Sequence, residues 1–116
     1  MGGNVSNEEF YCMHSDMCKT LANPKRQHIL DTLRDREMTV SELVEETGIS
    51  QSNLSQHLGI LRNKGVVKVR RQNAYAYYSI TSQKIIKAFD LITEAMQESL
   101  RSQNQAAGGN VASGST

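Results

Sequence analysis

The sequence predicts a mainly α-helical domain with one small β-hairpin. Helix start signals recur along the first half of the chain, each followed by apolar residues at helical spacing. The segment "VVKVRRQNAYAYYSI" then changes to strand-like alternation, rich in Val and Tyr. With 116 residues, 38% hydrophobic residues, no Trp and one Pro, the chain suits a single small helical domain better than a β-sandwich.

The first two helices begin at clear N-caps. Ser6, with Glu9 three residues later, forms a capping box that opens a helix through about Leu21. Asn23, followed by a proline at the first helical position, opens a second helix that runs to about Arg36. The inward-facing side chains of this second helix are Ile29, Leu30 and Leu33.

Two further helices are joined by the short turn "TGIS". Thr39 and Glu42 form a second capping box, and the helix that they open is stopped by Gly48. Ser50 caps the next helix, which ends at Gly65. Its apolar face consists of Leu54, Leu58 and Leu61. A short helix, a tight turn and a second helix make a helix-turn-helix.

The hairpin and a last helix complete the domain. Asn73 lies at a tight-turn position of the hairpin, and a helix-turn-helix followed by such a hairpin is a winged helix-turn-helix. The segment "TSQKIIKAFDLITEAMQESL" resumes a helical, coiled-coil-like apolar stripe. We therefore divide the chain into a flexible N-terminus (1–5), a winged helix-turn-helix domain for DNA binding and dimerisation (6–102) and a disordered, glycine-rich tail (103–116).

The distribution of charge is more informative than its sum of +1. Residues 1–46 carry a net charge of −4 and residues 90–116 a net charge of −2. Residues 47–89 contain no acid and seven bases. A surface without carboxylates, in a chain otherwise rich in them, favours a polyanionic partner, and this window coincides with the helix-turn-helix and the hairpin.

Double-stranded DNA is the polyanion that this arrangement predicts. The second helix of the motif enters the major groove, where amide and hydroxyl side chains match base edges, and basic residues contact phosphates. The predicted DNA-binding residues are Ser50, Gln51, Ser52, Asn53, Ser55, Gln56 and His57 on this helix, and Arg62, Lys64, Arg70 and Arg71 beyond it. His57 is the one among them that we also expect to pack against its neighbours.

The motifs together resemble the ArsR/SmtB family of small repressors, from about Leu21 to Ile80. "LANPKRQHIL" is similar to the opening of that family, "SQHLGILR" to its helix-turn-helix core and "VRRQNAYAYYSI" to its wing. The resemblance implies a repressor that an effector releases from a near-palindromic operator. The wing departs from the family pattern, because Asn73-Ala74 replaces the usual Gly-Arg.

The resemblance also implies a homodimer built from the first and last helices. Apolar stripes on both helices agree with this arrangement. The predicted interface residues are Phe10, Met13, Met17 and Leu21 on the first helix, and Ile85, Phe89, Ile92 and Met96 on the last.

The stretch "CMHSDMC" contains both cysteines of the chain. Three interpretations of Cys12 and Cys18 stay open: structural cysteines without a sensing role, a thiol redox or reactive-sulfur switch, and a thiophilic metal site with His14. The rise between the two cysteines is about 9 Å on a helix, beyond the roughly 7 Å Cα limit of a disulfide, so a bond within one chain requires the helix to break. The metal ligand sets of the family are absent by residue type, so a thiophilic metal ion at this stretch is the one candidate cofactor.

Other functions fit the sequence less well. We find no nucleophile with a base, no paired carboxylates and no phosphate-binding glycine loop, so we expect no enzyme. No apolar run is long enough for a membrane span, and we expect a cytoplasmic protein without a membrane partner. A winged-helix protein-interaction module without sequence-specific DNA binding is the alternative, and the acid-free window argues against it.

Overall fold

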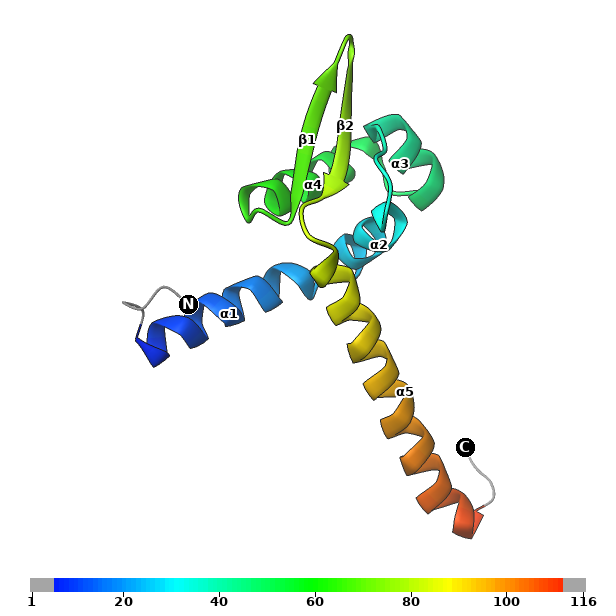
Figure 1. The fold of residues 1–116 in the computed structure, drawn as a ribbon. Helices are drawn as coiled ribbons and strands as arrows, with labels where there is room; N and C mark the ends of the chain where they lie inside the picture. Colours follow the sequence, from blue (N-terminus) through cyan, green and yellow to red (C-terminus); the bar gives the residue numbers. More distant parts are fainter. Residues whose placement is uncertain (1–5, 112–116) are drawn as a thin grey trace. The chain divides into compact units, whose positions relative to one another are not determined.

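The computed structural model describes residues 6–111, with side chains described for residues 6–105. The chain divides into two compact units, Met1–Gln83 and Lys84–Thr116. The elements of the first unit are α1 (Asn7–Leu21), α2 (Pro24–Leu33), α3 (Val40–Thr47), α4 (Gln51–Asn63), β1 (Val67–Gln72) and β2 (Tyr75–Ile80) (Figure 1). The helix α5 (Gln83–Val111) makes up the described part of the second unit. The predicted fold class, mainly α with a small hairpin, is confirmed.

The predicted capping boxes are present at α1 and α3. The Ser6 hydroxyl accepts a hydrogen bond from the Glu9 backbone N–H, and the Glu9 carboxylate accepts one from the Ser6 backbone N–H. Thr39 and Glu42 repeat this exchange at the start of α3. Each box satisfies backbone donors that the first turn of a helix leaves unpaired, so the helix starts are fixed by local chemistry.

The core of the first unit lies between α2, α3, α4 and the base of the hairpin. Its buried apolar side chains come from all of these elements: Ile29, Leu30, Leu33, Met38, Leu43, Ile49, Leu54, Leu58, Leu61, Val66, Val67 and Ile80. Helix α1 contributes little to this core, because Thr20 is its one buried residue. The helix-turn-helix is thus held by a continuous cluster of leucine, isoleucine and valine.

The hairpin is antiparallel, with Val67 opposite Ile80 and Gln72 opposite Tyr75. Asn73 begins the turn at a φ of 56°, in the left-handed region that asparagine tolerates better than most residues. A further bridge joins Met38 to Tyr78, with backbone hydrogen bonds of 3.0 and 2.8 Å. The loop between α2 and α3 is therefore attached to the edge of the wing.

Helix α2 ends earlier than the sequence predicts. The prediction placed its end near Arg36, whereas the helix ends at Leu33 and Arg34 leaves it with a φ of 25°. The early end lets Met38 reach β2 and become buried at 5% exposure. The free energy gained by burying Met38 and pairing it with the wing exceeds the free energy of one more exposed, charged helical turn.

Helix α5 ends later than predicted. The tail from residue 103 was predicted to be disordered, but the helix continues to Val111. The stretch "QNQAA" consists largely of residues with favourable helix propensity, which the prediction gave too little weight against the glycines that follow. The remaining tail (112–116) and the predicted flexible N-terminus (1–5) lie outside the described residues. Among the described residues, no helix combines the length and apolar character needed to cross a membrane.

Candidate nucleic-acid interface

The outward face of α4 carries small polar side chains. Gln51, Ser52, Asn53, Ser55 and Gln56 are all exposed. The opposite face is anchored by three buried leucines, at positions 54, 58 and 61. Amide side chains both donate and accept hydrogen bonds, as base edges in the major groove do, so this face has the chemistry to read a DNA sequence.

The start of α4 favours an anion. The Ser50 hydroxyl accepts a hydrogen bond from the Asn53 backbone N–H at 3.3 Å, and the first turn contains no acidic residue. The positive end of the helix dipole is therefore not offset by a local carboxylate. A DNA phosphate near this end would be attracted by the dipole and by the free backbone N–H groups.

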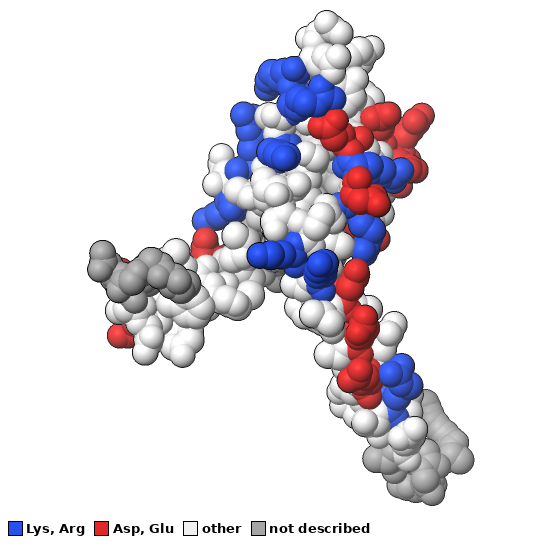
Figure 2. Space-filling model, viewed as in Figure 1, with Lys and Arg blue, Asp and Glu red and all other residues white. Residues whose placement is uncertain are grey.

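Basic side chains continue from the end of α4 into the wing. On the face seen in Figure 2, acidic side chains gather over α3, whereas basic ones lie over the wing and along α4. Arg62 and Arg71 are exposed, and neither forms an ion pair or hydrogen bond through its side chain within the described part of the chain. These two guanidinium groups are available to phosphates without first breaking a contact.

The other two predicted phosphate contacts are held by acids of the same chain. Lys64 Nζ lies 2.8 Å from Asp16 Oδ2 of α1, and Arg70 Nη2 lies 2.8 Å from Glu37 Oε1 in the loop before α3. Both pairs are exposed. Lys64 makes a single contact, so water and external anions compete for it, whereas Arg70 meets Glu37 through two hydrogen bonds, the geometry in which an exposed pair is strongest. The cationic surface is therefore partly neutralised by the protein itself.

His57 lies apart from the exposed polar face of α4. Its ring is half-buried, with Nδ1 3.4 Å from Nη1 of Arg26, whose Nε donates a 2.6 Å hydrogen bond to the Thr20 carbonyl. Burial lowers the pKa of His57 below its usual value, and the charges of Arg26 and Lys25 lower this pKa further. As a neutral ring, His57 thus links α4 to the end of α1 and the start of α2.

This pKa shift predicts a pH dependence of stability. A lowered pKa in the folded state means that the unfolded chain binds more protons as the pH falls below the unfolded value of about 6.5. The stabilisation by neutral His57 is present at pH 7.5 and is lost as the pH falls through the folded pKa. Urea unfolding at pH 7.5 and 5.5 measures this loss. Between these two pH values, the free energy of unfolding should fall less for His57→Gln than for the unchanged protein. His28→Gln, at an exposed position on α2, is the matched control, and an equal effect of both variants would contradict the assignment.

The sulfur-rich stretch of α1 lies on the surface. All residues from Cys12 to Cys18 are exposed, and both cysteines are free. Cys18 Sγ lies 3.6 Å from His14 Nδ1, whereas Cys12 borders a different, shallow hollow of about 490 Å³ beside Asp16 and Lys19. Within the described residues, no three His, Cys, Asp or Glu side chains gather closely enough to hold a metal ion. One protomer therefore offers a thiol–imidazole pair and not a complete metal site.

The predicted dimer residues of both helices include exposed apolar side chains. On α1, Phe10, Met13 and Met17 are 36%, 61% and 36% exposed, and Leu21 is half-buried. On α5, Ile92 and Met96 are 57% and 59% exposed, and Ile85 and Phe89 are half-buried. Apolar rows of this kind are typical of surfaces that another protein covers.

Sequence comparison decides the family. Residues 23–69 match the family of bacterial regulatory proteins named arsR. An HTH-type transcriptional regulator of Mycobacterium tuberculosis, Rv0081, is 42% identical over 82 residues, which cover 70% of this chain and 72% of the relative. The chain belongs to the arsR family. The predicted resemblance is confirmed, and this arsR-family chain is a DNA-binding transcriptional regulator and not an enzyme.

Solved structures with sequences similar to this chain share its fold. The crystal structure of Rv0081 matches with a TM-score of 0.74 at 36% identity, covering 81% of this chain and 95% of that one. The transcriptional repressor BigR of Xylella fastidiosa matches with a TM-score of 0.67 at 34% identity, covering 77% and 91%. A Mycobacterium bovis structure, described as a homodimeric winged helix-turn-helix DNA-binding domain, matches with a TM-score of 0.71 at 28% identity, covering 84% and 92%. The predicted winged helix-turn-helix is therefore confirmed, and α3 and α4 form its helix-turn-helix.

Sequence reasoning missed two acidic residues that pair with the predicted cations, Asp16 with Lys64 and Glu37 with Arg70. No local signal points to Glu37 or Asp16 as ion-pair partners, since they lie 33 and 48 positions from the cations that they contact.

Proposed function

We propose that this chain is a homodimeric repressor that binds a near-palindromic DNA operator and is released by an effector. The observation that carries the proposal is the acid-free window of residues 47–89, which contains both the exposed polar face of α4 and the wing. Repression is what BigR, a relative with the same fold, is named for. A regulator of this kind works where the DNA is, in the cytoplasm.

In this proposal, α4 is the recognition helix, whose side chains read bases, and the basic residues contact phosphates. The base-reading set comprises Gln51, Ser52, Asn53, Ser55 and Gln56, with Ser50 at the phosphate-facing helix start. Arg62 and Arg71 contact phosphates directly. Lys64 does so after exchanging Asp16 for a phosphate, and His57 supports the helix from behind.

Two copies associate through the apolar rows of α1 and α5. The Mycobacterium bovis structure is described as homodimeric, which supports the association of two copies. The exposed apolar side chains of Met13, Met17, Ile92 and Met96 would be removed from water in such a dimer. Two-fold symmetry then presents two copies of α4 to DNA about one helical turn apart, which suits an operator with two related half-sites.

The effector in this proposal acts at the sulfur residues of α1. The exposed Cys18–His14 contact favours a thiol switch, in which two thiols of the dimer lose two protons and two electrons to an oxidant and form a disulfide between protomers. A thiophilic metal ion held by Cys18 and His14 is the second candidate. Two ligands fall short of the three or four that soft metals usually take, so Cys12 or ligands from the partner must complete the site. The alternative to both is the interpretation that the sequence puts first, structural cysteines without a sensing role.

Fluorescence anisotropy of the reduced protein tests this function. The probe is the duplex upstream of its own gene, compared with a scrambled duplex of equal length. Each phosphate contact contributes about −0.9 to the slope of log K against log salt. Arg62 and Arg71 of each protomer therefore predict a slope of about −3.6 for the dimer, and the two Lys64 contacts bring it to about −5.4. Equal binding to both duplexes would contradict the proposal.

The same titration distinguishes the effectors. A thiol oxidant or a thiophilic metal ion is added to the complex in separate samples. If one addition lowers affinity at least tenfold, Cys18→Ser should abolish that response, with Ser15→Ala as the control on the same helix. If neither addition changes affinity, Cys12 and Cys18 are structural.

A further inference from the structure

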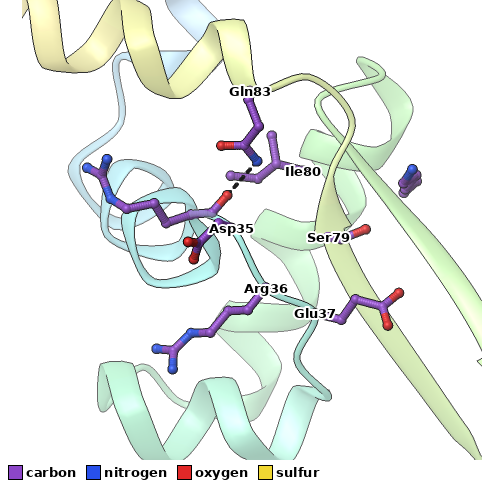
Figure 3. Close-up of a pocket in the computed structure, with 8 residues that line it drawn as sticks. Asp35, Arg36, Glu37, Ser79, Ile80 and Gln83 are labelled. Carbon is purple, nitrogen blue, oxygen red and sulfur yellow. Dashed lines mark hydrogen bonds between the residues drawn. The ribbon is translucent and has the colours of Figure 1, made fainter.

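The carboxylate of Glu37 lies next to the wing because of two backbone constraints. Helix α2 ends at Leu33, and Met38 is paired with Tyr78 of β2. Glu37 immediately precedes this bridge and lines a hollow of about 360 Å³ between its loop and the wing. In Figure 3, the side chains of Arg36 and Glu37 extend in opposite directions from the loop, with Glu37 on the side of the wing.

Arg70 is held there by three side chains at once. Its Nη2 and Nε donate hydrogen bonds to Oε1 and Oε2 of Glu37 at 2.8 and 3.0 Å. Its guanidinium carbon lies 4.7 Å from the ring centroid of Tyr77, its cross-strand neighbour on β2. Nη1 donates to Gln72 Oε1. A planar guanidinium that meets a carboxylate with two parallel hydrogen bonds and also stacks on a ring has its position fixed in three directions.

Both members of this pair are charged at any pH near neutrality. The hydrogen bond from Arg70 lowers the pKa of Glu37, and the same bond raises the pKa of Arg70. Arg71, the next residue, points to the other face of the strand and has no such partner within the described residues. Two adjacent arginines of one strand therefore have different surroundings.

We propose that Glu37 is a positioning residue for DNA binding, which fixes the wing through Arg70 and leaves Arg71 as the phosphate-contacting arginine of β1. This inference revises the role predicted for Arg70 from the sequence, and its DNA measurements rest on the proposed function. Arg70 acts through the wing and not through a phosphate. The wing is thereby attached to the loop before α3 at two successive residues, Glu37 and Met38.

The first test needs no DNA. Amide hydrogen exchange is measured over residues 67–80 in the free protein with Glu37→Gln, which keeps the shape of the side chain and removes its charge. We expect exchange in the wing at least threefold faster than in the unchanged protein. Glu45→Gln, at an exposed position on α3, is the control and should leave the wing unchanged. Unchanged exchange in Glu37→Gln would overturn the inference whether or not the chain binds its own upstream DNA.

The second test compares the two arginines on DNA. Arg71→Gln should lower the magnitude of the salt slope by about 1.8 for a dimer, because one phosphate contact per protomer is lost. Arg70→Gln should leave the slope unchanged and instead reduce the ratio of operator to scrambled-duplex affinity at least threefold, because the wing is misplaced. Glu37→Gln should reduce this ratio equally, and adding Arg70→Gln to it should reduce it no further. A loss of slope in Arg70→Gln equal to that in Arg71→Gln, or a rise in operator affinity with a steeper slope in Glu37→Gln, would overturn the inference.

Discussion

Replacing Gln56 with glutamate is expected to weaken operator binding at least a hundredfold. The substitution keeps the size of the side chain but places a carboxylate on the exposed face of α4, within a window of the chain that contains no acid. Like charges opposed at an interface cost several kcal/mol, and about 3 kcal/mol corresponds to a hundredfold. Anisotropy with the duplex upstream of the gene measures the loss.

The control for this variant is Gln103→Glu, the same change at an exposed position of α5. It adds the same formal charge far along the chain from the helix-turn-helix and should alter affinity less than threefold. Circular dichroism of both variants should match the unchanged protein, since neither side chain is buried. Full operator binding by Gln56→Glu would show that this face of α4 does not meet DNA.

Replacing Leu54 with alanine is expected to destabilise the domain by about 2–5 kcal/mol. Leu54 is fully buried, and its neighbours in the chain belong to the exposed polar face of α4. Truncating it therefore leaves a cavity beneath the part of α4 that reads DNA. Total stabilities of small domains are about 5–15 kcal/mol, so the variant loses a large share of its folding free energy. Urea unfolding at fixed protein concentration measures the loss, because dimer formation makes apparent stability depend on concentration.

Ile60→Ala is the matched control on the same helix. Ile60 is 40% exposed, and truncating it should cost about 1 kcal/mol or less. Comparable losses in the free energy of unfolding for Leu54→Ala and Ile60→Ala would mean that the leucine face of α4 does not pack in the core. Operator binding should follow stability, with Leu54→Ala weakened and Ile60→Ala nearly unchanged.

The features that could be predicted from sequence are those set by neighbours in the chain. The capping boxes at Ser6 and Thr39 involve residues three apart, and the turn at Asn73 depends on its own backbone preference. The buried leucines of α4 follow from helical spacing alone. These local signals suffice to identify the winged helix-turn-helix.

The features that escaped prediction depend on contacts between distant segments. Helix α2 ends at Leu33 because Met38 pairs with Tyr78, and nothing near Leu33 in the sequence indicates that partner. The sequence predicted that Arg70 contacts a phosphate, because its carboxylate partner Glu37 lies 33 positions away and is not evident from neighbouring residues. Sequence shows which side chains carry charge, but the fold decides which charges are already paired.

A hydroxyl-radical footprint of the reduced protein on the duplex upstream of its gene tests the central claim most directly. That claim is that two copies of this chain present their α4 helices and wings to one DNA duplex. We expect protection in two related half-sites whose centres lie about one helical turn, roughly 34 Å, apart. A single protected half-site, or uniform protection without sequence preference, would contradict the account of a symmetric, sequence-specific regulator.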